Sequence, residues 1–152
     1  MQTHTKKPWL KRILIIGLFI IAAGGTAIYF IFTEKFEDTG KQKAAFTVSA
    51  ENLIKEFQNS DSAANKKYTE KIGVVSGKIS ATEAADSTIN IKMMDSITGS
   101  YIIFAFQQQH IKEAKQLKEG DEVSIKGSCS GGAYSKILEA EFISFKRCTL
   151  NK

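Results

Sequence analysis

Residues 101–127 of this 152-residue chain read YIIFAFQQQHIKEAKQLKEGDEVSIKG, and they carry the pattern from which its fold is predicted. Tyr101–Phe106 is a run of aromatic and β-branched residues, which favours a strand. Residues 107–118 have apolar side chains at a helical spacing and precede Gly120, so they predict a short helix with a glycine C-cap. Residues 123–127 alternate apolar and polar side chains and predict another strand.

Two predicted strands precede this stretch and one follows it. Residues 72–79 and 89–93 are β-branched or alternate with period two, and residues 137–145 follow a turn predicted at residues 130–132. Three strands, a short helix and two strands is the order of the OB-fold, a five-stranded Greek-key barrel. The predicted fold class is therefore mostly β. A sandwich is the main alternative, but the lone helix favours the barrel, as do glycines where barrel strands bend: Gly73, Gly77 and Gly127.

An amphipathic helix is predicted ahead of the barrel, over residues 49–58. Its apolar side chains recur at i, i+3, i+4 and i+7, which forms one stripe on a helix: Ala50, Leu53, Ile54 and Phe57. Ser49 is suited to cap its N-terminus. Residues 63–68 suggest one or two further turns. Residues 33–46 are mostly polar without a clear period, and we interpret them as a tether.

A transmembrane helix is predicted over residues 13–32, ILIIGLFIIAAGGTAIYFIF, which contain no ionisable side chain. A helix of this length spans about 30 Å, the thickness of the hydrocarbon core of a bilayer. Basic residues beside a span stay in the cytoplasm, and four precede this one: Lys6, Lys7, Lys11 and Arg12.

The predicted organisation is a cytoplasmic basic N-terminus (1–12), a signal-anchor helix (13–32), a tether (33–46) and an exported OB-fold-like domain (47–152). The protein would then sit in the bacterial inner membrane, with its C-terminal domain in the periplasm. A cleaved signal peptide is the alternative, because small residues end the first apolar run. The run resumes over residues 28–32, which favours an uncleaved anchor, and either reading exports the domain.

The charge of the exported part is close to neutral. Four of the 21 Lys and Arg precede the apolar run and all 16 Asp and Glu follow it, so the part after it carries 17 minus 16, or +1. Dedicated nucleic-acid binders cluster cations on one face, so this balance counts against nucleic acid. Cys129 and Cys148 both lie in the exported part. A disulfide between them requires the C-terminal tail to fold back, because extended residues after a turn at 130–132 would carry Cys148 away.

Two stretches resemble a known family, AENLIKEFQNSDSAANKKYTEKIGVVSGKIS (50–80) and LKEGDEVSIKGSCSG (117–131). They are similar to the exported bacterial OB-fold family called tRNA anti-like, over roughly residues 45–145. The resemblance implies the fold, and it supplies no established catalytic residue or ligand. It also implies a second cysteine near Ala140, from which this chain departs. The matching residues are Ala50, Leu53, Phe57, Asn59, Ala64, Lys67, Tyr68, Val75, Gly77, Gly120, Asp121, Gly127 and Cys129.

Catalytic motifs are missing from the sequence, which contains no G-x-S-x-G, H-E-x-x-H, P-loop or Rossmann pattern. His110 is the one histidine after the apolar run, and its place at a predicted helix start favours a solvated or capping role. Structural zinc needs four N or S ligands, and only His110 could join the two cysteines. We therefore predict no metal, no cofactor and no enzymatic activity.

The predicted function is a binding or interaction module, since OB-folds bind on the face of strands two and three beside their loops. An aromatic side chain with nearby lysines could stack a base or a sugar ring. An envelope protein or a glycan is the favoured partner, and single-stranded nucleic acid is the alternative. Tyr101 and Tyr134 could instead merely cover the barrel rim. The candidate face comprises Asn90, Lys92, Tyr101, Ile103, Tyr134 and Lys136.

Overall fold

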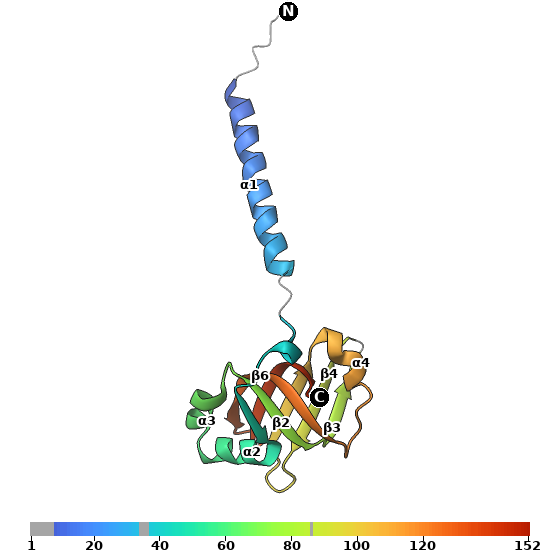
Figure 1. Cartoon of the computed structure of the whole chain (residues 1–152). Coiled ribbons are helices and arrows are strands. Elements are labelled where there is room, and N and C mark those ends of the chain that lie inside the picture. Colours follow the sequence, from blue (N-terminus) through green and yellow to red (C-terminus); the bar gives the residue numbers. More distant parts are fainter. Residues whose placement is uncertain (1–7, 34–36, 86) are drawn as a thin grey trace, which may run out of the picture. The chain divides into compact units, whose positions relative to one another are not determined.

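The computed structural model describes residues 8–33, 37–85 and 87–152, which fall into two units, Met1–Phe36 and Glu37–Lys152. Lys6 and Lys7 of the predicted basic N-terminus, and residues 34–36 of the predicted tether, lie outside the described residues. In the first unit, α1 (Pro8–Thr33) is a helix of 26 residues, as predicted for its central part (Figure 1).

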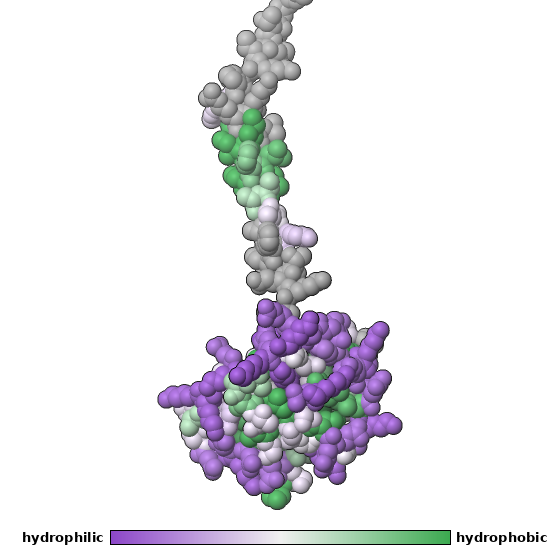
Figure 2. All heavy atoms as spheres, viewed as in Figure 1, coloured by the Kyte–Doolittle hydropathy of each residue, from purple (hydrophilic) through white to green (hydrophobic). Residues whose placement is uncertain are grey.

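The described side chains of α1 are largely apolar and exposed, among them Phe19 and Ile21, each 73% exposed (Figure 2). Within the described ranges, no helix has both the length and the apolar character that crossing a membrane requires. The transmembrane role of residues 13–32 stays a prediction.

The second unit is mostly β, as predicted, but its described residues form seven strands rather than five. Their order in the sheet is β1-β2-β6-β7-β5-β4-β3. The elements, in chain order, are η1 (Thr39–Lys41), β1 (Phe46–Ser49), α2 (Ala50–Asn59), α3 (Asp61–Tyr68), β2 (Ile72–Lys78), β3 (Ala81–Ala84), β4 (Ile89–Met94), β5 (Tyr101–Phe106), η2 (Gln108–His110), α4 (Ile111–Ala114), β6 (Glu122–Ser135) and β7 (Ala140–Leu150).

The strand predicted over residues 72–79 is β2, and the chain runs on into β3, a strand that the sequence analysis did not predict. The chain changes neighbours between the two, at Ile79 and Ser80. The N–H of Ile79 bonds to the carbonyl of Asp121, on the β6 side, at 2.9 Å. The next N–H, of Ser80, bonds to the carbonyl of Lys92 on β4 at 2.8 Å. The chain thus pairs with β6 along β2 and with β4 along β3, and this change of neighbour closes the barrel. The further strand, β1, pairs with β2 in parallel.

The prediction of an amphipathic helix is confirmed, and the prediction of a plain tether is partly wrong. Ser49 ends β1 and caps α2, where its side chain accepts from the N–H of Asn52. The predicted stripe is buried, with Leu53 and Phe57 fully shielded from solvent. Residues 37–46, however, include the short helix η1 and the first residue of β1, and Thr39 is only 1% exposed.

The helix predicted over residues 107–118 is much shorter, because only η2 and the single turn of α4 are helical there. Gly120 has a positive φ of 91° but does not cap α4. Its N–H bonds instead to the carbonyl of Ile79. This glycine therefore contributes to barrel closure rather than to a helix end.

The turn predicted at residues 130–132 is wrong, since β6 continues to Ser135 and the chain reverses at residues 136–139. The side-chain amide of Asn65 holds this stretch. Its Oδ1 accepts from the N–H of Gly132 at 3.0 Å, and its Nδ2 donates to the carbonyl of the same residue at 2.8 Å. Gly131, with φ 98°, forms a bulge where the register with β7 shifts.

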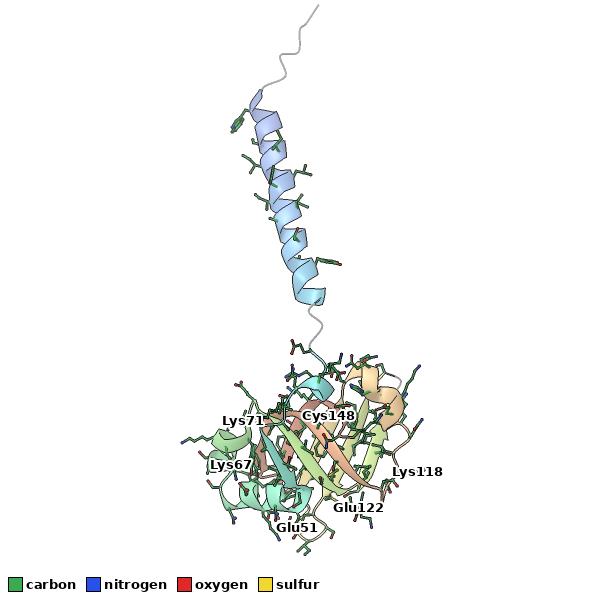
Figure 3. The ribbon with its side chains drawn as sticks, in the orientation of Figure 1. Glu51, Lys67, Lys71, Lys118, Glu122 and Cys148 are labelled. Carbon is green, nitrogen blue, oxygen red and sulfur yellow. The ribbon has the colours of Figure 1, made fainter. Side chains whose placement is uncertain are left out.

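The later reversal brings the two cysteines back onto paired strands, as free thiols rather than a disulfide. Cys129 on β6 lies opposite Phe145 on β7. Cys148, labelled in Figure 3, lies so close to Gly127 that a Cβ there would be 2.6 Å from its Sγ. Both thiols are buried, and burial raises the pKa of each. A cysteine with a raised pKa is a poor nucleophile.

The barrel core contains Phe104, which is fully buried and lies 5.3 Å from the ring of Phe145, measured between centroids. We expect Phe104→Ala to lower the free energy of unfolding by about 3–5 kcal/mol, since it removes a buried ring and leaves a cavity. Urea unfolding followed by circular dichroism measures the change. Ile137→Ala is the matched control, because Ile137 is 94% exposed and its truncation should stay within about 0.5 kcal/mol. Equal losses in both variants would contradict this core.

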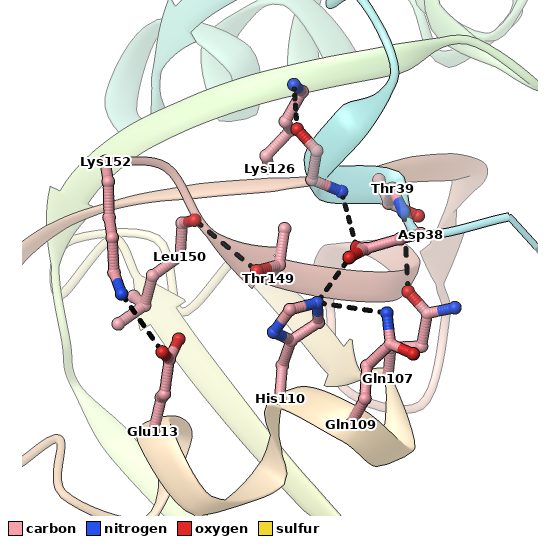
Figure 4. Close-up of polar contacts among 11 residues, drawn as sticks. Asp38, Thr39, Gln107, Gln109, His110, Glu113, Lys126, Thr149, Leu150 and Lys152 are labelled. Atoms are coloured by element: carbon pink, nitrogen blue, oxygen red, sulfur yellow. Dashed lines mark hydrogen bonds and ion pairs between the residues drawn. The ribbon is translucent and has the colours of Figure 1, made fainter.

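A cluster of polar contacts fastens residues 38–40 to the barrel (Figure 4). Asp38 Oδ1 lies 2.9 Å from Nε2 of His110 and accepts from the N–H of Gly40 at 2.9 Å. Lys126 Nζ donates to the carbonyl of Gly40 at 3.1 Å. His110 occupies the N-cap position of α4 without a side-chain capping bond. The capping role predicted for it is therefore replaced by a bond to Asp38.

We expect this cluster to add an acid-sensitive contribution to stability. The hydrogen bond with His110, followed by the one from Gly40, lowers the pKa of Asp38 below its ordinary 3.8. A carboxyl with a depressed folded-state pKa stabilises above its unfolded pKa, and the effect disappears as the pH falls through the folded-state pKa. Melting temperatures of the native chain and of Asp38→Asn, measured from pH 7 to pH 2, should differ at neutral pH and converge in acid. Curves that stay parallel would contradict the assignment.

Candidate functional site

The outer face of β4 and β5 carries four of the predicted site residues, each half-buried. Asn90 and Lys92 on β4 alternate with fully buried neighbours, as do Tyr101 and Ile103 on β5. Strand side chains point to opposite faces in turn, so these four share the outer face as predicted. Their binding role stays a prediction.

The strand register arranges this outer face in rows. Met94 lies opposite Tyr101, Tyr101 opposite Phe142 on β7, and Phe142 opposite Ala133 on β6. Directly opposite side chains on neighbouring strands are in contact range. The row from Met94 through Tyr101 to Phe142 is therefore a continuous apolar strip across three strands, which we call the aromatic row.

A second row of side chains on the same face, two residues along each strand from the aromatic row, contains the charged residue Lys92. Lys92 lies opposite Ala81 on β3 and opposite Ile103 on β5. Its ammonium lies 5.3 Å from the centroid of the Tyr101 ring and also pairs with Glu83. The one cation of this row is thus shared between an aromatic face and a carboxylate.

A hollow of about 350 Å³ opens beside the aromatic row. Small residues leave space there, because Ala81, Gly99 and Ala140 contribute little side-chain volume. Tyr101 and Leu138 form walls. The hollow is wide enough for a planar ring or an apolar side chain, with the Tyr101 ring as the surface to stack against. Its lining residues are Ser80, Ala81, Lys92, Met94, Gly99, Tyr101, Leu138 and Ala140.

Tyr134 and Lys136 do not join the other four predicted residues. Tyr134 lies opposite Glu141, a buried residue, and so belongs to the other face of the sheet from the aromatic row. Lys136 lies in the turn after β6, exposed, and does not line the hollow. The predicted set is therefore split, because the true turn at residues 136–139 reverses the chain later than expected.

Phe142 and Leu138 are the site residues that the sequence analysis missed. Phe142 is 37% exposed and Leu138 is 59% exposed. The signal was present in the alternation of β7, where Ile143 and Phe145 are fully buried and the residue before them must face outward. This alternation predicts the outward position of Phe142 only if the turn before β7 is placed correctly.

Exposed apolar residues gather at the end of the barrel where β5 and β7 begin. Ile97 is 92% exposed in the loop before β5, and Ile137 is 94% exposed in the turn before β7. Tyr101 pairs with Phe142, so the two loops lie at the same end. Figure 2 shows a hydrophobic tip at this end of an otherwise mainly hydrophilic surface.

The buried titratable group nearest this end is Glu141, which is 6% exposed. Its N–H donates to Ser100 Oγ at 3.1 Å, and its Oε2 has no hydrogen-bond partner among the described residues. Burial, helped by the charge of Asp61, raises the pKa of this carboxyl. Glu141 faces away from the hollow, so it does not add a carboxylate to the candidate site. The part of the chain that the structure describes contains no cluster of three metal-ligating side chains.

Three solved structures that are similar to this chain differ in how closely they match, and only the first has a TM-score above 0.5. A candidate nucleic acid-binding lipoprotein from Klebsiella pneumoniae subsp. pneumoniae MGH 78578 matches with a TM-score of 0.55 and 16% identity, over 69% of this chain and 91% of that chain. An OBody bound to hen egg-white lysozyme matches with a TM-score of 0.42 and 17% identity, over 57% and 87% of the two chains. Aspartyl tRNA synthetase from Entamoeba histolytica matches with a TM-score of 0.44 and 7% identity, over 72% of this chain and 25% of that chain.

The first of these likenesses shows the fold alone, given its low identity. No curated protein matches the sequence. The family model named tRNA_anti-like matches residues 1–140, which is most of the chain and includes the N-terminal segment that the predicted resemblance, over residues 45–145, left out. The predicted family is thereby confirmed. The chain belongs to the tRNA_anti-like family.

Proposed function

We propose that this protein is a non-catalytic binding module of the bacterial envelope, and that the aromatic row and its hollow bind a protein partner. The observation that carries the proposal is the placement of Met94, Tyr101 and Phe142 in one register line beside an open hollow. Aromatic residues and methionine are enriched at protein interfaces, and charged residues are depleted at their centres.

The charge of the face favours a protein over a polyanion. Among the described residues, Lys92 is the one cation lining the hollow, and its ammonium already pairs with Glu83. The exposed Ile97 and Ile137 extend the apolar surface beyond the hollow. A glycan would need more hydrogen-bonding groups than these residues offer, so it is the less favoured partner.

The position of the module at a membrane is part of the proposal. It is supported by residues 13–32, which have no ionisable side chain and are helical within α1, and by the four cations that precede them. We propose that the domain after them is exported. A phosphatase reporter fused after Lys152 should then be active, and activity of a cytoplasmic reporter at the same place would contradict the topology.

The absence of catalysis is likewise proposed from the surroundings of the reactive groups. The thiols of Cys129 and Cys148 are buried, and His110 is engaged with Asp38. None of these groups lines the hollow. A substrate held there would meet the polar side chains of Ser80, Lys92 and Tyr101.

A photocrosslinking amino acid in place of Phe142 tests the partner. In intact membranes we expect a discrete protein adduct, and Tyr101→Ala should reduce its yield, because truncating an aromatic at the centre of an interface typically weakens affinity by about 30-fold. The matched control places the crosslinker at Lys112, an exposed residue of α4 outside the hollow. The same adducts from both positions, or none from position 142, would contradict the proposal.

Single-stranded nucleic acid is the second candidate, and one observation favours it. The ammonium of Lys92 lies over the ring of Tyr101, and a cation beside a stacking platform is how OB-folds hold single strands. The Klebsiella neighbour bears a nucleic acid-binding name. The near balance of 17 cations and 16 anions after the apolar run counts against this candidate.

A salt titration with a fluorescent oligonucleotide distinguishes the two candidates. Binding to phosphates releases counterions, so affinity for an oligonucleotide would fall steeply with salt. We expect no binding even at low salt, about 20 mM. Saturable binding that weakens with salt and disappears in Lys92→Gln would favour nucleic acid and remove the protein partner from this face.

A further inference from the structure

A second groove, of about 540 Å³, lies between the first half of α2, the end of β2 and the loop after β4. It shares Met94 with the hollow beside the aromatic row, and otherwise has its own lining. Figure 3 shows Glu51 of this groove at the same end of the barrel as Glu122. Glu122 lines a neighbouring depression that shares Ser76 and Gly77 with the groove.

One wall of the groove is a strand edge that β1 leaves uncovered. β1 pairs with β2 from Phe46 opposite Gly73 to Ser49 opposite Ser76. The chain then enters α2, while β2 continues to Lys78. Lys78 therefore lies two residues beyond the last pair, on the line that β1 would have followed.

The backbone of Lys78 faces this gap. Both backbone groups of Ile79 bond towards β6, its N–H to Asp121 and its carbonyl to Gly120. Successive residues of a strand turn their N–H and carbonyl groups to opposite sides. The N–H and carbonyl of Lys78 must therefore point away from β6 and into the groove.

The groove has an apolar floor and charged side chains around it. Ile54 and Met93 are buried below it, and a flexible thioether adapts to varied side chains. Glu51 is paired with Lys55 across one helical turn. Among the charged residues that line the groove in the described part of the chain, only Lys78 and Asp95 have no ion-pair partner. The carboxylate of Asp95 accepts from the N–H of Ile97 and the hydroxyl of Thr98. The side chain of Lys78 is exposed and extends towards Gly120, so its ammonium can reach a carboxylate bound at the rim of the groove.

We infer that this groove binds an extended peptide segment of a partner protein, which adds a strand beside β2 at Lys78 in line with β1. Main-chain hydrogen bonds to an exposed strand edge supply affinity in this mode, and pockets for alternate side chains supply specificity. The partner segment has apolar side chains facing Ile54 and Met93, and one carboxylate facing the ammonium of Lys78. This site is separate from the one proposed at the aromatic row.

Amide hydrogen exchange in the full chain tests the free edge. The N–H groups of Gly77 and Ile79 face β6 and should exchange slowly, whereas that of Lys78 should exchange at least tenfold faster, as expected for an edge without a partner. Equal protection of Lys78 and Gly77 would show that the edge is occupied and would overturn the inference.

Peptide binding tests the occupant. The probes are six-residue peptides that alternate valine and threonine, with one glutamate at each position in turn. We expect at least one to bind the full chain with a Kd below about 1 mM and to slow exchange of the Lys78 amide. N-methylation of the backbone amides of that peptide should abolish binding. Failure of the whole set to bind would overturn the inference.

Two variants of Lys78 distinguish the contribution of its backbone N–H to peptide binding from that of its side chain. Lys78→Pro removes the N–H that faces the groove, and proline is tolerated where a strand N–H has no ladder partner. It should melt like the native chain and lose the peptide. Lys78→Gln keeps the N–H and should weaken binding by only about threefold, the usual worth of an exposed ion pair.

If Lys78→Pro unfolds, the N–H of Lys78 makes a hydrogen bond that the barrel needs. If Lys78→Pro folds and binds the peptide as the native chain does, the peptide does not pair with this strand edge. Either result overturns the inference. Tyr101→Ala is the control for the aromatic row and should bind the peptide normally. Loss of peptide binding in Tyr101→Ala would place the peptide in the other hollow and would also overturn the inference.

Discussion

The barrel depends on the change of neighbour at Ile79 and Ser80. Two consecutive backbone N–H groups there bond to opposite sides, one to Asp121 and the next to Lys92. This pair of bonds lets a single stretch of chain complete two ladders, with β6 along β2 and with β4 along β3. A sheet that closes on itself has no long edge to protect from association with other chains.

The same change of neighbour creates both surfaces to which we assign binding. On one side of the bend, β3 and β4 carry Ala81 and Lys92, which border the hollow beside Tyr101. On the other side, β2 runs two residues beyond its last pair with β1, and the groove at Lys78 lies beside this uncovered end. Met94 lines both the hollow and the groove.

The polar groups that fall inside the fold have structural rather than chemical consequences. Glu141 keeps an unpartnered oxygen at the barrel end, away from the hollow. Asp38 and His110 fasten the segment that leads into β1, and Asn65 fastens the bulge of β6. Asp38, His110 and Asn65 each stabilise an irregular backbone segment, where ladder hydrogen bonds are interrupted. The surfaces to which we assign binding, by contrast, combine strand side chains with side chains from α2 and from the loops beside the strands.

Local patterns predicted the parts of the fold that local forces determine. The stripe of Leu53 and Phe57 and the Ser49 cap predicted α2 correctly, because helix periodicity and capping act within a few residues. Alternation on β4 and β5 likewise predicted the outward positions of Lys92 and Tyr101.

The predictions failed where a distant residue sets the backbone. Gly131 and Gly132 read as a turn, yet Asn65, 67 residues away from Gly132, holds them in a bulge within a long strand. With the turn at residues 136–139, Phe142 lies in the aromatic row and Cys148 comes back beside Gly127. Composition and periodicity therefore determined α1 and α2, the faces of β4 and β5 and the mostly β class. The register of β6 and β7, and with it the binding face, follows from long-range hydrogen bonds that short-range patterns do not encode.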